Sequence, residues 1–162
     1  MIDFKRPVSS YFDFTFWAFP VRRWAEIVPA YLQFCEEYRR RTGFRPALPT
    51  EVYYIRKDDH ALLSFCPDDD IFTLDAVNWS DEEPGCWRSF NQAYNEFALQ
   101  HGGRPILNQT KELPATLRLY PSVAPLLWRQ PWRDLAVERL SRDPHDRFLT
   151  PYFRDVLPPL PS

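Results

Sequence analysis

Glycine is scarce in this sequence. The chain has four glycines among 162 residues, at positions 43, 85, 102 and 103. Loops that bind the phosphates of nucleotides depend on closely spaced glycines, because the backbone has to approach the phosphate oxygens. No GxGxxG motif or other glycine-rich turn is present. We therefore expect the chain by itself to bind no dinucleotide cofactor tightly.

Cysteine clusters and long apolar runs are also missing. Cys35, Cys66 and Cys86 stand far apart, form no CxxC motif and have no histidine at the spacing of metal ligands. This pattern predicts buried thiols, and it argues against a disulfide framework and a bound metal. The N-terminal residues contain no apolar signal segment, and no apolar run long enough to cross a bilayer follows. We therefore expect a soluble, cytoplasmic protein with no membrane partner.

Neither sign of charge dominates. The 20 Lys and Arg residues nearly balance the 22 Asp and Glu residues, for a net charge of −2. This balance gives no electrostatic reason to expect a nucleic-acid partner. The basic run at 39–41 ends a helical pattern, where cations complement the helix dipole.

Aromatic residues are abundant instead, at 17% of the chain, within an apolar content of 44%. Aromatic side chains bury large areas, so either core packing or an aromatic pocket explains this richness, and their regular spacing favours the core. A chain of this length forms one domain with a core and is marginal for two. We predict a single domain over residues 1–157, followed by a proline-rich tail at 158–162.

The segment 9–19 alternates as a β-strand does. Its purely apolar face carries Phe12, Phe14, Phe16 and Ala18, and its mixed aromatic and polar face carries Tyr11, Asp13, Thr15, Trp17 and Phe19. The mixed face suits either a pocket wall or a second packed layer.

A helix is predicted next. Apolar residues from Trp24 to Tyr38 repeat at helical spacing, and Gly43 is placed to end the helix. Because proline lacks a backbone N–H, we expect the main helix to begin at Pro29 after one preliminary turn. Glu36 with Arg40, and Glu37 with Arg41, have the spacing of ion pairs on the polar side.

The remaining pattern predicts an α+β fold. Three short apolar runs at 51–56, 61–66 and 71–77 have charged links, which favours an antiparallel meander. A second helix is predicted at 84–101, stopped by Gly102 and Gly103. Short helices are predicted within 114–140 and at 151–157, packed by Trp128, Trp132, Leu135, Phe148, Tyr152 and Phe153. This order indicates an antiparallel β-sheet with helices packed on one face, and the other face free to line a cavity.

Four stretches in order carry a resemblance to a known family: DFTFWAFP, LPTEVYYIRKDDHALLS, YNEFALQHGGRPILNQTKEL and RDPHDRFLTPYFRDVL. Together they resemble the C-terminal substrate-binding, or cap, domain of flavin oxidases of the vanillyl-alcohol oxidase superfamily, nearest to the aldonolactone and alditol oxidase branch. The resemblance covers nearly the whole chain. It implies a cap that covers the flavin ring and supplies much of the substrate pocket, while a separate domain holds FAD.

The resemblance also points to particular positions. The family presents a Glu-x-Arg strand, which matches here at Glu51, whereas Tyr53 stands where arginine is usual. It also presents an Arg-Pro-His-Trp-x-Lys segment, whose arginine and proline match while two apolar residues replace His and Trp. The lysine corresponds to Gln109 without a gap or to Lys111 with a two-residue shift. The apolar replacements suggest a less polar substrate. The segment here is Arg104, Pro105, Ile106, Leu107, Asn108, Gln109, Thr110 and Lys111.

Each candidate residue has a structural alternative. Glu51 and Tyr53 share a strand face and are either an acid/base pair or hydrogen-bond anchors, or else Glu51 is a strand-edge residue paired with an arginine. Lys111 is either a pocket cation or a solvated loop lysine. We predict Glu51, Tyr53 and Lys111 as catalytic residues.

The expected substrate-binding residues are Trp17, Arg104, Asn108 and Gln109. For Asn108 and Gln109 the alternative is hydrogen bonding to the backbone, and for Trp17 it is core packing. We expect residues 108–111 to form one wall of a pocket and Glu51 with Tyr53 the facing wall. No residue is predicted to bind a metal or a cofactor.

Three functions compete at this point. The first is a stand-alone or detached cap that binds a small-molecule substrate and acts with a separate flavin-binding protein, through which FAD participates. The second is a cofactor-free cyclase, isomerase or lyase acting on a small, partly apolar metabolite, and the third is a non-catalytic binding module. The polar cluster at 108–111 favours the first two. A cap also predicts an exposed apolar patch, and therefore a homodimer or a heteromeric complex.

Overall fold

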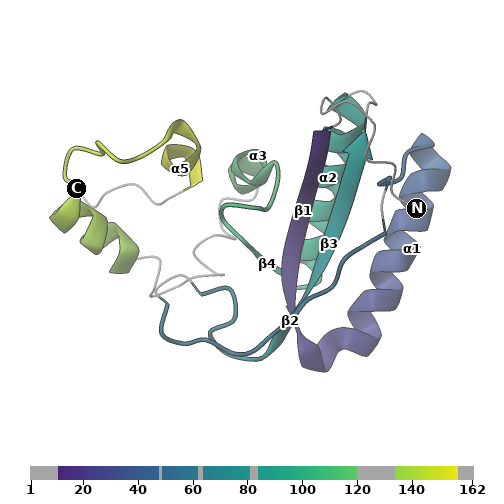
Figure 1. Ribbon diagram of the computed structural model, residues 1–162, viewed down its shortest axis with the longest axis horizontal. Helices are drawn as coiled ribbons and strands as arrows, with labels where there is room; N and C mark the ends of the chain where they lie inside the picture. The colour runs from purple at the N-terminus through teal and green to yellow at the C-terminus, as the bar shows by residue number, and fades with distance from the viewer. Residues whose placement is uncertain (1–10, 48, 62–63, 81–83, 120–133, 157–162) are drawn as a thin grey trace, which may run out of the picture.

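The computed structural model describes residues 11–47, 49–61, 64–80, 84–119 and 134–156. Its elements, in chain order, are β1 (Tyr11–Pro20), the 3₁₀ helix η1 (Val21–Arg23), α1 (Trp24–Thr42), β2 (Tyr54–Ile55), β3 (Ile71–Ser80), α2 (Pro84–Gln100), β4 (Arg104–Pro105), α3 (Leu113–Leu119) and α5 (Pro151–Val156). Residues 134–142 are also helical. The predicted α+β fold is confirmed, with α1 and α2 on the same face of an antiparallel sheet (Figure 1).

The sheet has the strand order β2-β3-β1-β4, and each pairing is antiparallel. Its centre is the long pair β1–β3, whose register runs from Tyr11 opposite Ser80 to Pro20 opposite Ile71. The two edges are short, because β2 and β4 contribute two residues each. An isolated bridge between Glu51 and Asp75 extends the β2 edge along β3.

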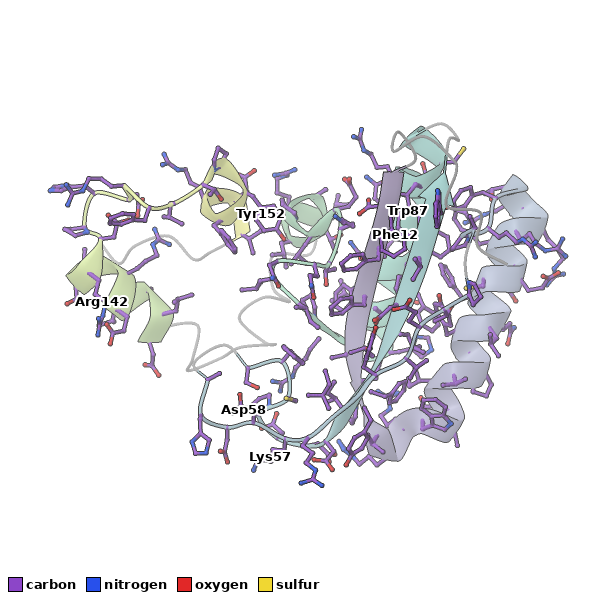
Figure 2. The ribbon with its side chains drawn as sticks, viewed as in Figure 1. Phe12, Lys57, Asp58, Trp87, Arg142 and Tyr152 are labelled. Atoms are coloured by element: carbon purple, nitrogen blue, oxygen red, sulfur yellow. The ribbon has the colours of Figure 1, made fainter. Side chains whose placement is uncertain are left out.

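The mixed face of β1, not the apolar one, is covered by the helices. Trp17 and Phe19 are fully buried in the same core cluster as residues of α1 and α2, whereas Phe12 on the other face is 54% exposed. Asp13 also lies on the mixed face, where its carboxylate has a hydrogen-bond partner because the Trp87 indole N–H donates to its Oδ2 at 2.8 Å. Figure 2 places Phe12 and Trp87 near the same end of the β1–β3 pair. The helices therefore leave the apolar side of β1 uncovered.

Aromatic rings form most of the core between the sheet and the two helices. Phe34 of α1 stacks on Phe97 of α2 with ring centroids 5.1 Å apart, and Tyr31 lies 5.3 Å from Tyr94. The Tyr94 hydroxyl donates a hydrogen bond to the Leu74 carbonyl at 2.7 Å, so its polar end is satisfied inside the core. Burial of each such ring stabilises the folded state by about 1.5–3 kcal/mol, so a small number of aromatic residues is enough to form this core.

Helix α1 ends as predicted but does not begin as predicted. Gly43 adopts φ 79° and its N–H donates to the Arg39 carbonyl at 2.8 Å, which is a glycine C-cap. Pro29 lies inside the helix, so the expected start at that residue is wrong. The proline removes the bond to the Ala25 carbonyl, and both residues are exposed, which lets water solvate that carbonyl.

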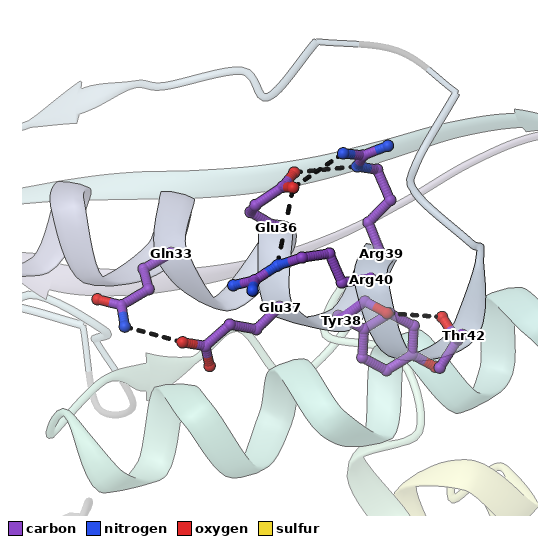
Figure 3. A network of polar contacts seen from close by, with 7 residues as sticks. All are labelled: Gln33, Glu36, Glu37, Tyr38, Arg39, Arg40 and Thr42. Carbon is purple, nitrogen blue, oxygen red and sulfur yellow. Dashed lines mark hydrogen bonds and ion pairs between the residues drawn. The ribbon is translucent and has the colours of Figure 1, made fainter.

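Of the two ion pairs predicted on the polar side of α1, one forms. Glu36 binds Arg39 at 2.8 Å and lies 3.9 Å from Arg40, whereas Glu37 accepts a hydrogen bond from Gln33 (Figure 3). Arg41, its expected partner, lies over the Tyr38 ring at 5.5 Å. These pairs are exposed, so solvent screens them and they contribute little to stability.

The predicted three-strand meander is wrong in its middle strand. Residue 61 and residues 64–66 are not in a strand. Cys66 and Phe65 instead pack on Ala18 and Ile71, so this loop covers one end of the helix-free face. Burial alone, without a ladder of hydrogen bonds, explains the apolar run that predicted a strand.

The helix predicted at 84–101 is confirmed as α2, which ends one residue earlier than predicted. Gly102 adopts φ 67°, its N–H donates to the Leu99 carbonyl, and the Gly103 N–H donates to the Ala98 carbonyl at 2.8 Å. This pair of bonds is a Schellman motif, which ends a helix at a left-handed glycine.

Helix α3 lies beside the β4 edge, outside the face that α1 and α2 cover, and α5 lies on the far side of α3 (Figure 1). Leu113 and Leu117 of α3 form a small cluster with Val156 of α5, and Tyr152 packs against it. Phe148, expected to pack there, is 83% exposed. Trp128, Trp132 and the predicted tail at 158–162 lie outside the described residues.

Candidate functional site

The helix-free face of the sheet, called the open face below, is the main candidate site. The β1–β3 register and the Glu51–Asp75 bridge bring its side chains from three segments. Phe12 and Trp79, at its outer end, are 54% and 37% exposed. The open face consists of Phe12, Phe14, Phe16 and Ala18 from β1, Thr73, Asp75, Val77 and Trp79 from β3, and Glu51 and Tyr53 beside β3.

Three phenylalanine rings form a row along the β1 side of the open face. Phe12 and Phe14 lie 6.0 Å apart, and Phe14 and Phe16 are stacked at 6.0 Å with an interplanar angle of 8°. Trp79 meets Phe12 edge-on at 6.5 Å. Phe12 is exposed and Phe14 and Phe16 are partly exposed, so the row offers an apolar surface on which a planar or apolar partner can pack.

Asp75 is the ionisable group at the centre of this face. It is 3% exposed, and its Oδ1 has no hydrogen-bond partner among the described residues. Burial raises the pKa of its carboxyl from the ordinary value to about 7, a rise opposed by the Thr73 hydroxyl and reinforced by the charge of Glu51. Sequence reasoning missed this residue, although a single carboxylate inside the buried run IFTLDAV was a signal for it.

Glu51 and Tyr53 lie together beside Asp75, as their shared strand face predicted. Backbone hydrogen bonds of 3.0 and 2.9 Å join Glu51 to Asp75, so the two side chains project from the same face. The Tyr53 hydroxyl donates to Glu51 Oε2 at 2.9 Å, and this bond raises the pKa of Tyr53. Both side chains are exposed, so the predicted pair is accessible. Its catalytic role stays a prediction.

Lys111 is far from this pair. Its backbone N–H donates to Thr15 Oγ1 and its ammonium lies 2.8 Å from Asp13 Oδ1, which places it at the opposite edge of the two central strands and on the helix side. Strands β1 and β3 therefore stand between Glu51 and Lys111. The expected pocket with these two residues on facing walls is wrong, because sequence spacing alone does not fix the edge on which a segment lies.

The polar segment 108–111 secures the edge of β1. The Gln109 and Thr110 N–H groups both donate to the Ile106 carbonyl, and the buried Thr110 hydroxyl donates to the Phe16 carbonyl at 2.7 Å. Asn108 is exposed and Gln109 is partly exposed. The alternative of backbone hydrogen bonding thus describes this turn. Their proposed contact with a substrate has no geometric support at the open face.

A buried asparagine ties this turn to the core. Asn95 accepts a hydrogen bond from the Trp17 indole N–H at 2.9 Å, and its Nδ2 donates to the Lys111 carbonyl and to Thr116 Oγ1, both at 2.8 Å. Trp17 is fully buried, so its ring is a core residue and offers no surface to a ligand in this conformation. The packing alternative holds for Trp17.

Arg104 lies at the other end of the open face. It stands opposite Ala18 in the β4 pairing, and its guanidinium lies 2.5 Å from Asp68. It lines a pocket of about 250 Å³ together with Arg22, Arg23, Asp69 and Cys66, among others. Arg22 and Arg23 are also paired, with Asp69 and Glu26. The charges of this pocket are therefore largely satisfied within the chain.

Metal ligation finds no support in the described part of the chain. No group of three or more His, Cys, Asp or Glu side chains there is arranged to hold an ion. The three cysteines are free, and burial raises the pKa of the Cys35 thiol to about 11, which keeps it protonated. No helix of the described residues is long and apolar enough to cross a membrane.

Comparison with known proteins finds no similar protein. No protein-family model matches this sequence, no curated protein matches it, and no solved structure matches the fold. Fold and site define an α+β protein with an antiparallel sheet, one face of which is covered by two helices while the other bears aromatic rings and carboxylates.

Proposed function

We propose that this chain is a substrate-binding cap domain that works with a separate flavin-binding domain as an FAD-linked oxidoreductase. In this proposal the open face lies toward the flavin and forms one side of the substrate pocket. The observation that carries it is the row Phe12, Phe14 and Phe16 beside the acidic group Asp75, on a sheet face that α1 and α2 leave uncovered. The ordered resemblance of the sequence to the cap domains of flavin oxidases gives the class of partner.

The chemistry of the open face fits a cap better than a flavin carrier. FAD needs a cradle of backbone N–H groups for its diphosphate, and the carboxylates of Asp75 and Glu51 repel such an anion. The flavin, once bound by the partner, would supply redox chemistry. The residues of this chain would exclude water through the phenylalanine row and orient a substrate through Asp75, Glu51 and Tyr53.

The test is co-expression of the chain with the product of the adjoining coding sequence, followed by copurification and a search for bound flavin. Phe12→Ser is the open-face variant, and Leu32→Ser on α1 is its matched control, since these side chains are 54% and 60% exposed. Loss of an aromatic anchor typically weakens a complex by about 2 kcal/mol or more, roughly thirtyfold. We expect Phe12→Ser alone to release the flavoprotein, measured by the flavin absorbance that copurifies. Equal release by both variants, or no flavoprotein in the complex, contradicts the proposal.

A second function has one observation in its favour. A carboxyl whose pKa is about 7 is suited to give and take a proton near neutral pH, which is what a cofactor-free isomerase or lyase needs. The distinguishing result is turnover of a small, partly apolar metabolite by flavin-free protein that disappears in Asp75→Asn. Turnover that persists in that variant rules out this role for Asp75.

A further inference from the structure

We propose that the open face carries a recognition site for a small organic ammonium group, bound by the carboxylates of Asp75 and Glu51 and packed against the ring of Phe16. This inference rests on the proposed function, because it names the substrate class of the pocket that the cap would supply. Phe16 and Glu51 stand directly opposite Asp75 on its two neighbouring segments, so the three side chains are adjacent on one face.

The first reason is the unmet hydrogen-bond acceptor of Asp75. Its Oδ1 is buried and has no partner among the described residues, while the carboxyl interacts with the hydroxyl of Thr73. An acceptor left unpaired in a protein interior is unfavourable. A ligand that brings an N–H donor to Oδ1 removes this penalty.

The second reason is the sign of the charge around Asp75. The β2 side contributes Glu51 and Tyr53, and β1 contributes the uncharged Phe14 and Phe16. Across the sheet, α1 and α2 contribute Tyr31 and Tyr94, and burial raises the pKa of both phenols, so they stay neutral. In the described chain the charged group that faces Asp75 is thus another carboxylate. Such a site favours a cation over a neutral or anionic ligand.

The third reason concerns the kind of cation. Calcium and magnesium ions need at least about six oxygen ligands, and the described residues contain no group of three metal-binding side chains. An organic ammonium group needs fewer donors, and its alkyl or aryl part packs on rings such as Phe14 and Phe16, stacked 6.0 Å apart. The aromatic row therefore favours an amine over a metal ion.

Glu51 and Tyr53 lie next to the buried acceptor. Both side chains are exposed, and one hydrogen bond of 2.9 Å joins them. An ammonium group that displaces the phenol takes over its position on Glu51 and reaches Asp75 with a second N–H. Binding is then expected to release the Tyr53–Glu51 bond.

The test uses benzylammonium chloride as probe on the full chain without any flavoprotein. Backbone amide shifts in NMR spectra report the dissociation constant at about pH 8 and about pH 5.5, and a primary amine of this kind is protonated at both values. Benzyl alcohol is the neutral isostere, and magnesium chloride is the metal probe. Asp75→Asn removes the charge, and Asp155→Asn, an exposed carboxylate paired with Arg118, is the control.

We expect benzylammonium to shift the amides of Glu51, Tyr53 and Asp75 and to bind about tenfold tighter than benzyl alcohol at the higher pH. Affinity should fall about tenfold at the lower pH and in Asp75→Asn, and stay unchanged in Asp155→Asn. Glu51→Gln, at an exposed position, should weaken binding severalfold even if Asp75→Asn does not fold. Equal binding of the alcohol, magnesium in place of the amine, or wild-type affinity in both open-face variants overturns the proposal. Because no flavoprotein is present, amine binding and flavin partnership succeed or fail separately.

Discussion

Removal of the Asp75 charge is expected to stabilise the protein at slightly alkaline pH. The carboxyl is 3% exposed and burial raises its pKa to about 7, far above the value near 4 that it takes in an unfolded chain. The folded state therefore holds this proton more tightly than the unfolded state. The stability that the protonated group contributes is complete at low pH and is lost as pH rises through about 7.

The size of the effect follows from the two pKa values. One pKa unit corresponds to about 1.4 kcal/mol, and between about pH 5 and pH 8 the loss is roughly 2.5 kcal/mol. In Asp75→Asn this loss disappears, because the amide has nearly the same shape and does not titrate. At about pH 8 the variant should be more stable than the wild type by about 1–3 kcal/mol, and at about pH 5 the two should differ by less than about 1 kcal/mol.

Urea unfolding followed by tryptophan fluorescence measures this difference. With a urea dependence of about 2 kcal/mol per molar, the wild-type midpoint should fall by about 1 M between the two pH values relative to the variant. Carboxyls with lowered pKa, such as Asp70 and Asp143, stay ionised throughout this window. The reasoning is refuted if wild type and variant show the same pH dependence.

Further substitutions test other parts of the structure. Asn95→Ala should cost about 3 kcal/mol in urea unfolding, since it removes three hydrogen bonds, to Trp17, Lys111 and Thr116. The exposed Asn108→Ala should cost about 0.5 kcal/mol, and equal costs would show that the Asn95 network is unimportant. Gly103→Ala should destabilise the protein by about 2 kcal/mol, because the added Cβ would stand 2.8 Å from the Phe19 ring. In the control Gly85→Ala, the added Cβ meets no atom within 4 Å, so stability should not change. A neutral Gly103→Ala would contradict this packing. The chain purified alone should show no flavin absorbance after gel filtration, and a band that survives would contradict the need for a partner.

Local chemistry in the sequence was enough to predict several elements. The end of α1 follows from Gly43 and the end of α2 from Gly102, since only glycine adopts these left-handed conformations readily. The two faces of β1 follow from its alternation, and the shared face of Glu51 and Tyr53 follows from the same period. Such signals lie within a few residues of one another, so no knowledge of distant contacts is needed.

The tertiary structure decided which face of β1 became the core. Alternation is the same for both faces, and the sequence left open whether the mixed face lines a pocket or packs against a second layer. Asp13 and Thr15 are accepted beneath the helices because Trp87 and the Lys111 backbone, 74 and 96 residues away, satisfy them. The same long-range contacts place Lys111 at the β1 edge, away from Glu51, and the β1–β3 register brings Asp75 beside Phe16. Hydrogen-bond partners and strand order are set by residues distant in sequence, so the open face and its acidic group were decided by the fold.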